Sequence, residues 1–148
     1  MNQILLIRLI SIIGALLGGI SLIRVLCGYG VLINLPVFYI LAIVYHVGLI
    51  MSGCMLFNLK NIGRVSFLFL MTLGFLFSLI AFISMKNHWA SSFFTGVIYP
   101  FVPFRFAMEI VYCTQSLFVE HIHIYCSILL PLVFILYLIR SNVRKKFV

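Results

Sequence analysis

The densest group of potentially reactive side chains is Glu120-His121-Ile122-His123, where a carboxylate and two imidazoles fall within four residues. Carboxylate oxygens and imidazole nitrogens are ligands that zinc and copper use in proteins. Histidines two residues apart do not share one face of a helix, so metal binding here would require extended backbone. We therefore interpret the group as an interfacial polar cluster, and we expect no metal or other cofactor.

The two acidic residues of the chain, Glu109 and Glu120, lie in one stretch between long apolar runs, and there is no aspartate. Arg105 stands four residues before Glu109, the spacing at which opposite charges pair on a helix. Polar residues recur at helical spacing from Phe104 to Phe118, with apolar residues mainly on the other side. This pattern predicts an amphipathic helix at the outer membrane interface, with a re-entrant segment as the alternative. Contact with a substrate or a soluble partner is expected here.

His46 lies near the middle of a long uncharged apolar run. An ionisable side chain within a membrane is costly and usually faces protein or water, so a proton relay, a substrate contact or a haem ligand are the functional interpretations. Haem held between two histidines needs both at one depth, whereas His88, His121 and His123 belong to the outer end. We favour a neutral, hydrogen-bonded histidine that holds the helices together, and a proton or substrate role remains the alternative.

The four cysteines do not form a Cys-x-x-Cys motif. Cys27, Cys113 and Cys126 are expected near the outer side, and Cys54 near the inner end of its span, roughly a bilayer thickness away. At most one disulfide can then form among the outer three. The two communicating pairs of a membrane disulfide-forming oxidoreductase are therefore not available.

The elements that position these residues are set by composition. The chain is 65% apolar and 8% charged, its mean hydropathy is +1.29, and such a sequence cannot coat a water-soluble fold. Backbone in lipid must satisfy its own hydrogen bonds, and continuous rather than alternating apolar runs favour helices over a barrel. We predict an all-α integral membrane protein, a single domain over 1–148 with four transmembrane helices at about 5–26, 36–59, 65–85 and 122–139. The outer segment 86–121, between the third and fourth spans, contains the amphipathic interfacial helix.

Charge placement predicts the orientation of these spans. With both termini in the cytoplasm, seven of the ten Lys and Arg residues are inside and three outside, as the positive-inside rule requires. The net charge of +8 is then a topology signal with attraction to anionic lipid, rather than a nucleic-acid surface. We expect a multi-pass protein of the bacterial inner membrane, in which the first apolar run is an uncleaved span; a signal peptide is the alternative.

Small residues mark helix-packing surfaces. The first span carries one small-residue stripe that includes a Gly-x-x-x-Gly pattern, which allows another helix to approach closely; a weaker surface of this kind lies in the second span. Packing within the chain and packing on another subunit are both compatible with it. The helix-packing residues are Ser11, Gly14, Ala15, Gly18 and Ser21 in the first span, and Gly48 and Ser52 in the second.

These features favour a non-catalytic accessory or structural subunit, or an assembly factor, of a larger membrane protein complex. Such a protein would act by helix packing and through its outer amphipathic helix, with other membrane subunits or its own copies as partners. The first alternative is a small oligomeric transporter, channel or lipid-handling protein working around His46. The second is a membrane enzyme or redox protein that uses the cluster at Glu120, His121 and His123.

Overall fold

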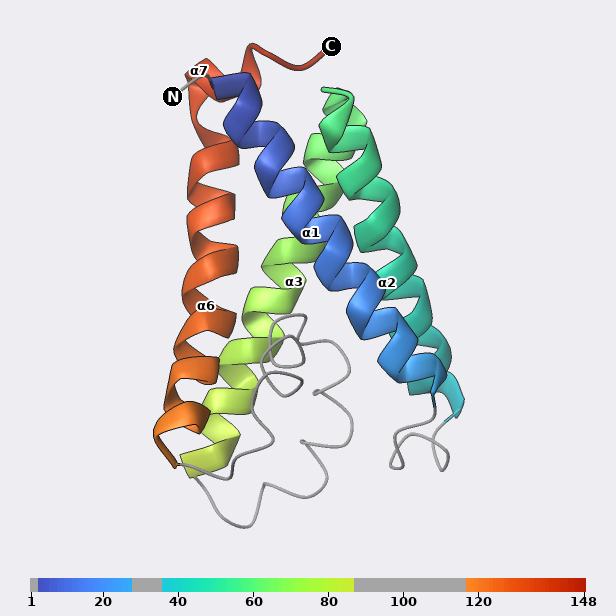
Figure 1. The fold of residues 1–148 in the computed structure, drawn as a ribbon, viewed down its shortest axis with the longest axis vertical. Coiled ribbons are helices and arrows are strands. Elements are labelled where there is room, and N and C mark those ends of the chain that lie inside the picture. Colours follow the sequence, from blue (N-terminus) through green and yellow to red (C-terminus); the bar gives the residue numbers. More distant parts are fainter. Residues whose placement is uncertain (1–2, 28–35, 87–116) are drawn as a thin grey trace.

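The computed structural model describes residues 3–27, 36–86 and 117–148, and the regular structure in these ranges is helical (Figure 1). Four long helices run antiparallel to their chain neighbours, so both ends of the chain lie at the same end of the bundle. Helix α1 packs on α2, α2 on α3 and α3 on α6. The helices are α1 (Gln3–Leu26), α2 (Pro36–Phe57), α3 (Asn61–Lys86), α6 (Leu117–Ile139) and the short α7 (Ser141–Arg144).

Three of the described helices contain stretches long and apolar enough to cross a membrane, in Gln3–Ile23, Val37–Phe57 and Asn61–Ile80. Each of these stretches coincides with an uncharged or nearly uncharged run of the sequence. A helix suits such a run in lipid because it pairs every backbone group within the segment. The prediction of an all-helical protein with membrane-spanning helices is confirmed at this level. Helix α6 has the shorter apolar stretch Ile128–Ile139 among the described residues, and it begins at Leu117, earlier than the predicted start of the fourth span.

The bundle has one large apolar core that joins all four long helices. Phe67 and Met71 of α3 lie at its centre, and Leu138 of α6 packs there with no exposed surface. A second, smaller cluster lies toward the other end of the α1–α2 pair. The remaining members of the large core are Ile7, Ile10, Leu17, Leu49, Leu56, Phe134 and Val143, and those of the smaller one are Val25, Ala42 and Tyr45.

A tight turn joins α2 to α3 at the end of the bundle where the termini lie. Leu59 adopts the left-handed conformation with φ 56°, which favours glycine because a Cβ atom is strained there. The amide of Lys60 donates to the Met55 carbonyl over 3.0 Å, and the amide of Leu59 donates to the Leu56 carbonyl over 2.9 Å. This pair of bonds is a Schellman motif, which terminates α2 and reverses the chain.

The last residues of the chain close this end of the bundle. After α7, the amide of Val148 donates to the Leu59 carbonyl over 3.0 Å, and its carbonyl accepts from the Asn61 amide over 2.9 Å. The C-terminal segment thereby bridges from α6 to the α2–α3 turn. It also supplies a partner for the carbonyl of the strained Leu59, a backbone group that the helices leave unpaired.

Candidate functional site

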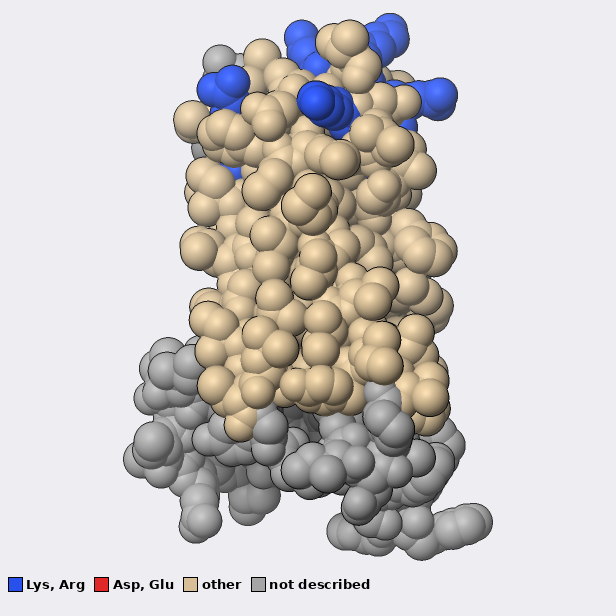
Figure 2. Space-filling model, turned by 90° about the vertical axis from the view of Figure 1, so that its right-hand side faces the viewer, with Lys and Arg blue, Asp and Glu red and all other residues tan. Residues whose placement is uncertain are grey.

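Positive charge gathers at one end of the bundle (Figure 2). Each of these residues ends an apolar run or lies in a turn, so antiparallel helices bring residues far apart in sequence to one end. The described side chains include no Asp or Glu, so this end has no side-chain carboxylate within the described part of the chain. The cations that form it, called the basic end below, are Arg8, Lys60, Arg64, Arg140, Arg144, Lys145 and Lys146.

Arg64 is the buried cation of the basic end, with 8% of its surface exposed. Its Nε donates to Asn61 Oδ1 over 3.1 Å, its Nη1 donates to the Leu138 carbonyl over 3.4 Å, and its guanidinium carbon lies 5.7 Å from the Phe147 ring centroid. The Leu138 carbonyl belongs to the last turn of α6, where carbonyls lack helical partners and the helix dipole favours a cation. Arg64 therefore caps α6 from α3.

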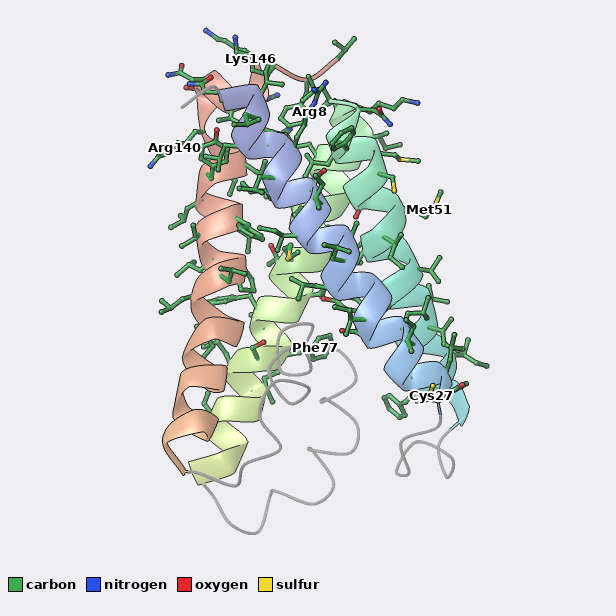
Figure 3. All side chains as sticks on the ribbon, in the orientation of Figure 1. Arg8, Cys27, Met51, Phe77, Arg140 and Lys146 are labelled. Carbon is green, nitrogen blue, oxygen red and sulfur yellow. The ribbon has the colours of Figure 1, made fainter. Side chains whose placement is uncertain are left out.

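Arg8 has different surroundings although it lies at the same end. Its side chain is exposed, and its guanidinium carbon lies 5.2 Å from the ring centroid of Phe57 on α2 (Figure 3). Within the described residues the guanidinium donates to no acceptor. A guanidinium held over an aromatic face keeps its planar set of donors directed away from the ring. Arg8 is therefore a positioned cation whose hydrogen-bonding groups remain available.

The predicted small-residue stripe lies at the contacts of α1 with two other helices. A Cβ atom at Gly18 would lie 3.2 Å from the His46 carbonyl oxygen and 3.1 Å from Ile50 Cγ1, and one at Gly14 would meet the Phe67 ring. Ser11 and Ser21 are buried, with 1% and 4% of their surfaces exposed. The Ser11 hydroxyl donates to the Arg8 carbonyl over 3.0 Å, which satisfies it within α1.

Helix α2 meets α1 with small residues of its own. A Cβ atom at Gly53 would lie 3.1 Å from Ala15 Cβ and 3.1 Å from the Ser11 carbonyl oxygen. Ser52 is buried, and its hydroxyl donates to the Leu49 carbonyl over 3.0 Å. The predicted packing residue Gly48 faces α3 instead, because a Cβ atom added to it would lie 3.3 Å from Leu70 Cδ1. The α1–α2 contact is therefore close because glycine stands on both helices.

His46 is completely buried at this contact. Its ring lies edge-on to Tyr45, with the centroids 5.0 Å apart and the planes at 72°. The Tyr45 hydroxyl donates to the Leu70 carbonyl of α3 over 3.1 Å. The two polar side chains are thus enclosed in the bundle, and the Tyr45 hydroxyl has a backbone acceptor there, which offsets the cost of its burial.

The outer polar residues are placed only in part. Arg105 and Glu109 lie outside the described residues, as does the predicted amphipathic helix except for its last two positions. Glu120, His121 and His123 belong to the first turns of α6, so their backbone is helical rather than extended. The extended conformation that a metal site on this cluster would need is therefore not the one adopted.

Two of the four cysteines have described side chains. Cys27 and Cys54 are exposed free thiols, and they stand near the end of α1 and near the end of α2, toward opposite ends of the bundle. Cys113 and the side chain of Cys126 lie outside the described part of the chain. The expected separation of Cys54 from Cys27 follows from the antiparallel arrangement.

Several residues that shape the site were not singled out by sequence reasoning. Gly53 completes the α1–α2 contact, and Gly63 lets the first turn of α3 approach α2, because an added Cβ would meet Met55 and lie 2.6 Å from the Leu56 amide nitrogen. Arg64 was interpreted only as a topology signal. Whether a residue beside a turn is buried or caps another helix depends on which side of its helix faces the bundle. The local sequence does not determine that side.

The chain has no significant match among protein-family models, curated proteins or solved structures. Its class therefore rests on its own features: an all-helical protein in which three helices are long and apolar enough to span a membrane, with a cationic rim at one end.

Proposed function

We propose that this protein is a non-catalytic accessory or structural subunit, or an assembly factor, of a larger membrane protein complex. It binds its partners laterally, within the plane of the membrane, through the outer faces of its helices. The amphipathic segment predicted around Arg105 and Glu109 supplies a second contact at the outer surface. Its immediate surroundings are the lipid bilayer and other membrane subunits or further copies of the same chain.

The observation that carries this proposal is a notch on the outer face of α1. A Cβ atom at Gly19 would meet nothing within 4 Å, although the adjacent Gly18 is tightly packed against α2. Large exposed side chains border the notch, Leu16 at 60% and Ile23 at 62% exposure. A small residue between large ones on a membrane helix permits close approach of another helix. Gly19 therefore suits a partner helix better than it suits lipid.

The proposed membrane placement has four spans and cytoplasmic termini in a bacterial inner membrane. Helix α6 has 23 residues, a length sufficient to cross a bilayer. It returns the chain to the end at which α1 begins, where the described cations gather. By the positive-inside rule this basic end belongs in the cytoplasm.

The surroundings of His46 support a packing role over the alternative of a transport pathway. A residue that handles protons or substrate needs a water-filled or substrate-filled approach, whereas His46 has no exposed surface and lies against Tyr45. If the alternative holds, His46→Ala abolishes a measured flux in reconstituted vesicles. Unchanged flux would exclude that role for His46.

The test is affinity purification in a mild detergent with mass spectrometry of the bound proteins, comparing wild type with Gly19→Leu. The added leucine fills the notch but meets no described atom within 4 Å of the Cβ position, so the fold is expected to persist. Val44→Leu on the exposed face of α2 is the matched control, since Val44 is 61% exposed. We expect a stoichiometric partner with wild type and the control, and its loss with Gly19→Leu.

Two results would contradict the proposal. One is recovery of the wild-type chain as a stable monomer in detergent, without any partner. The other is recovery of the same partner in equal amount with Gly19→Leu, which would show that the notch on α1 is not the contact.

A further inference from the structure

We propose that Arg8 and Phe57 form a binding site for the phosphodiester group of an anionic phospholipid, in the leaflet at the basic end. The site, called the Arg8 corner, lies at the same end of the bundle as the exposed Lys60 of the α2–α3 turn. The inference concerns lipid rather than a partner subunit, and it does not depend on the proposed function.

The basic end carries seven cations and has no side-chain carboxylate among the described residues, so it attracts anions from its surroundings. The sequence has ten Lys and Arg residues and two glutamates, and both glutamates lie away from the basic end in sequence. Arg64 donates to Asn61 Oδ1 and to the Leu138 carbonyl, whereas Arg8 donates to no acceptor among the described residues. An anion brought to Arg8 therefore displaces no existing hydrogen bond.

The position of the guanidinium suits a phosphate. The ring of Phe57, 5.2 Å from the guanidinium carbon, restricts the arginine side chain before a ligand arrives. Pre-ordering a flexible side chain lowers the entropy that binding must offset. Arginine donates two parallel hydrogen bonds to phosphate oxygens, which lysine cannot do from one nitrogen. Lys60 adds a further positive charge at the same end of the bundle.

An apolar track runs from the Arg8 corner toward the centre of the bundle. Ile12 and Leu16 follow Arg8 at intervals of four residues on α1, and both are exposed, at 45% and 60%. Helix neighbours at this spacing lie on one face. The track has the direction that an acyl chain takes below its headgroup.

This combination favours a phospholipid over an acidic protein segment. A phospholipid carries its negative charge directly above its hydrocarbon chains, and the corner presents a cation directly above exposed apolar side chains. An acidic peptide would match the cation but would leave the track uncovered. Juxtamembrane cations attract anionic lipid by about 1 kcal/mol each, which corresponds to about a fivefold change in affinity.

The test is native mass spectrometry of the full-length protein titrated with phosphatidylglycerol, or with phosphatidylcholine of the same acyl chains. Wild type is expected to bind the first phosphatidylglycerol more tightly than phosphatidylcholine. Arg8→Gln should weaken that first binding about fivefold. Arg144→Gln removes the same charge from an exposed position on α7, and it should change the affinity less than about twofold, since no built site is lost. Arg8→Lys should fall between wild type and Arg8→Gln.

Three outcomes would overturn the inference. Equal losses with Arg8→Gln and Arg144→Gln would show diffuse attraction rather than a site. Equal affinity of wild type for the two lipids would show that the site does not select a net negative headgroup, because phosphatidylcholine has the same phosphodiester next to a cationic choline. Displacement of bound phosphatidylglycerol by glycerol phosphate at the same concentration would show a phosphate site without an acyl-chain contribution. A thermal unfolding midpoint of Arg8→Gln equal to that of wild type ensures that the comparison concerns binding.

Discussion

Two corners of the basic end use the same pair of residue types for different purposes. At one corner Arg64 lies over Phe147, is 8% exposed and donates to Asn61 and the end of α6. At the other, Arg8 lies over Phe57, is exposed, and has that ring as its side-chain contact within the described residues. Both residues are arginines at the same end of the bundle, so the difference comes from burial and from available acceptors.

Burial changes what an arginine contributes. A buried guanidinium loses its hydration, and it is stable only where acceptors replace the water. The Arg64 corner provides a side-chain amide oxygen and an unpaired helix carbonyl, so its cation becomes a structural joint between α3 and α6. The Arg8 corner provides no such acceptor within the described part of the chain, so its guanidinium can donate hydrogen bonds to a ligand outside the bundle.

Arg64→Gln should give the largest effect that distinguishes the corners. It removes the charge and shortens the side chain, which leaves the Leu138 carbonyl and the Asn61 amide oxygen without this donor. Hydrogen bonds to charged groups contribute about 1.5–3 kcal/mol, so we expect a loss of about 3 kcal/mol in the free energy of unfolding. Denaturation of the purified protein by SDS measures it. Arg144→Gln, an equal charge change at an exposed position, is the control, and a similar loss in both would refute a capping role.

Gly63→Ala tests whether the Arg64 corner depends on the close approach of α3 to α2. The new methyl group would meet the backbone of Leu56 and the side chain of Met55. Overpacking of this kind costs about 1–3 kcal/mol, and we expect about 2 kcal/mol because backbone atoms must move. Gly19→Ala is the control, since its methyl group meets nothing. Equal unfolding midpoints for the two variants would mean that the turn is not constrained as described.

Deletion of Phe147 and Val148 removes the segment that closes the Arg64 corner. The chain loses the ring beside Arg64 and two backbone hydrogen bonds, to Leu59 and from Asn61. We expect a loss of about 1 kcal/mol, because each net hydrogen bond contributes about 0.5–1.5 kcal/mol and the exposed groups regain water. Val148→Ala keeps the backbone bonds and should unfold like wild type. A truncated protein as stable as wild type would show that the closure does not stabilise the fold.

Arg8→Gln should have the smallest effect on stability, about 0.5 kcal/mol, because it removes one exposed cation–π contact with Phe57 and no hydrogen bond within the described residues. Its effect should instead be on lipid affinity. Thermal unfolding in detergent, without added anionic lipid, separates the two properties. A stability loss matching that of Arg64→Gln would erase the distinction between the corners.

Adjacent glycines show where sequence reasoning succeeds and where it ends. The Gly14-x-x-x-Gly18 pattern predicts close packing, and Gly18 does lie against the α2 backbone. Gly19, the next residue, has open space around its Cβ position. One residue turns a helix by about 100°, so the identity of the packed glycine depends on the rotation of α1 about its axis. That rotation is set by all the contacts of the bundle together.

Leu59 is a second example. The polar residues between the second and third spans predict a turn, but a left-handed residue there would be expected to be glycine or asparagine. The chain has Leu59 in that conformation, partly buried against the core and bonded through its carbonyl to Val148. The local Schellman bonds place Leu59 in this conformation, while its contacts with the core and with Val148, nearly ninety residues away, cannot be read from the local sequence.

By itself the sequence determined the properties that depend on composition and run length. Long uncharged apolar runs become helices in lipid, because lipid offers the backbone no other partner. Most of the cations lie at alternate ends of those runs, so antiparallel helices bring them to one end of the bundle. Tertiary structure alone decided which of two residues of the same type faces the bundle and which faces outward. Gly18 and Arg64 face inward, whereas Gly19 and Arg8 face outward. The physical reason is that burial and hydrogen-bond acceptors are properties of the assembled bundle, supplied by residues distant in the chain.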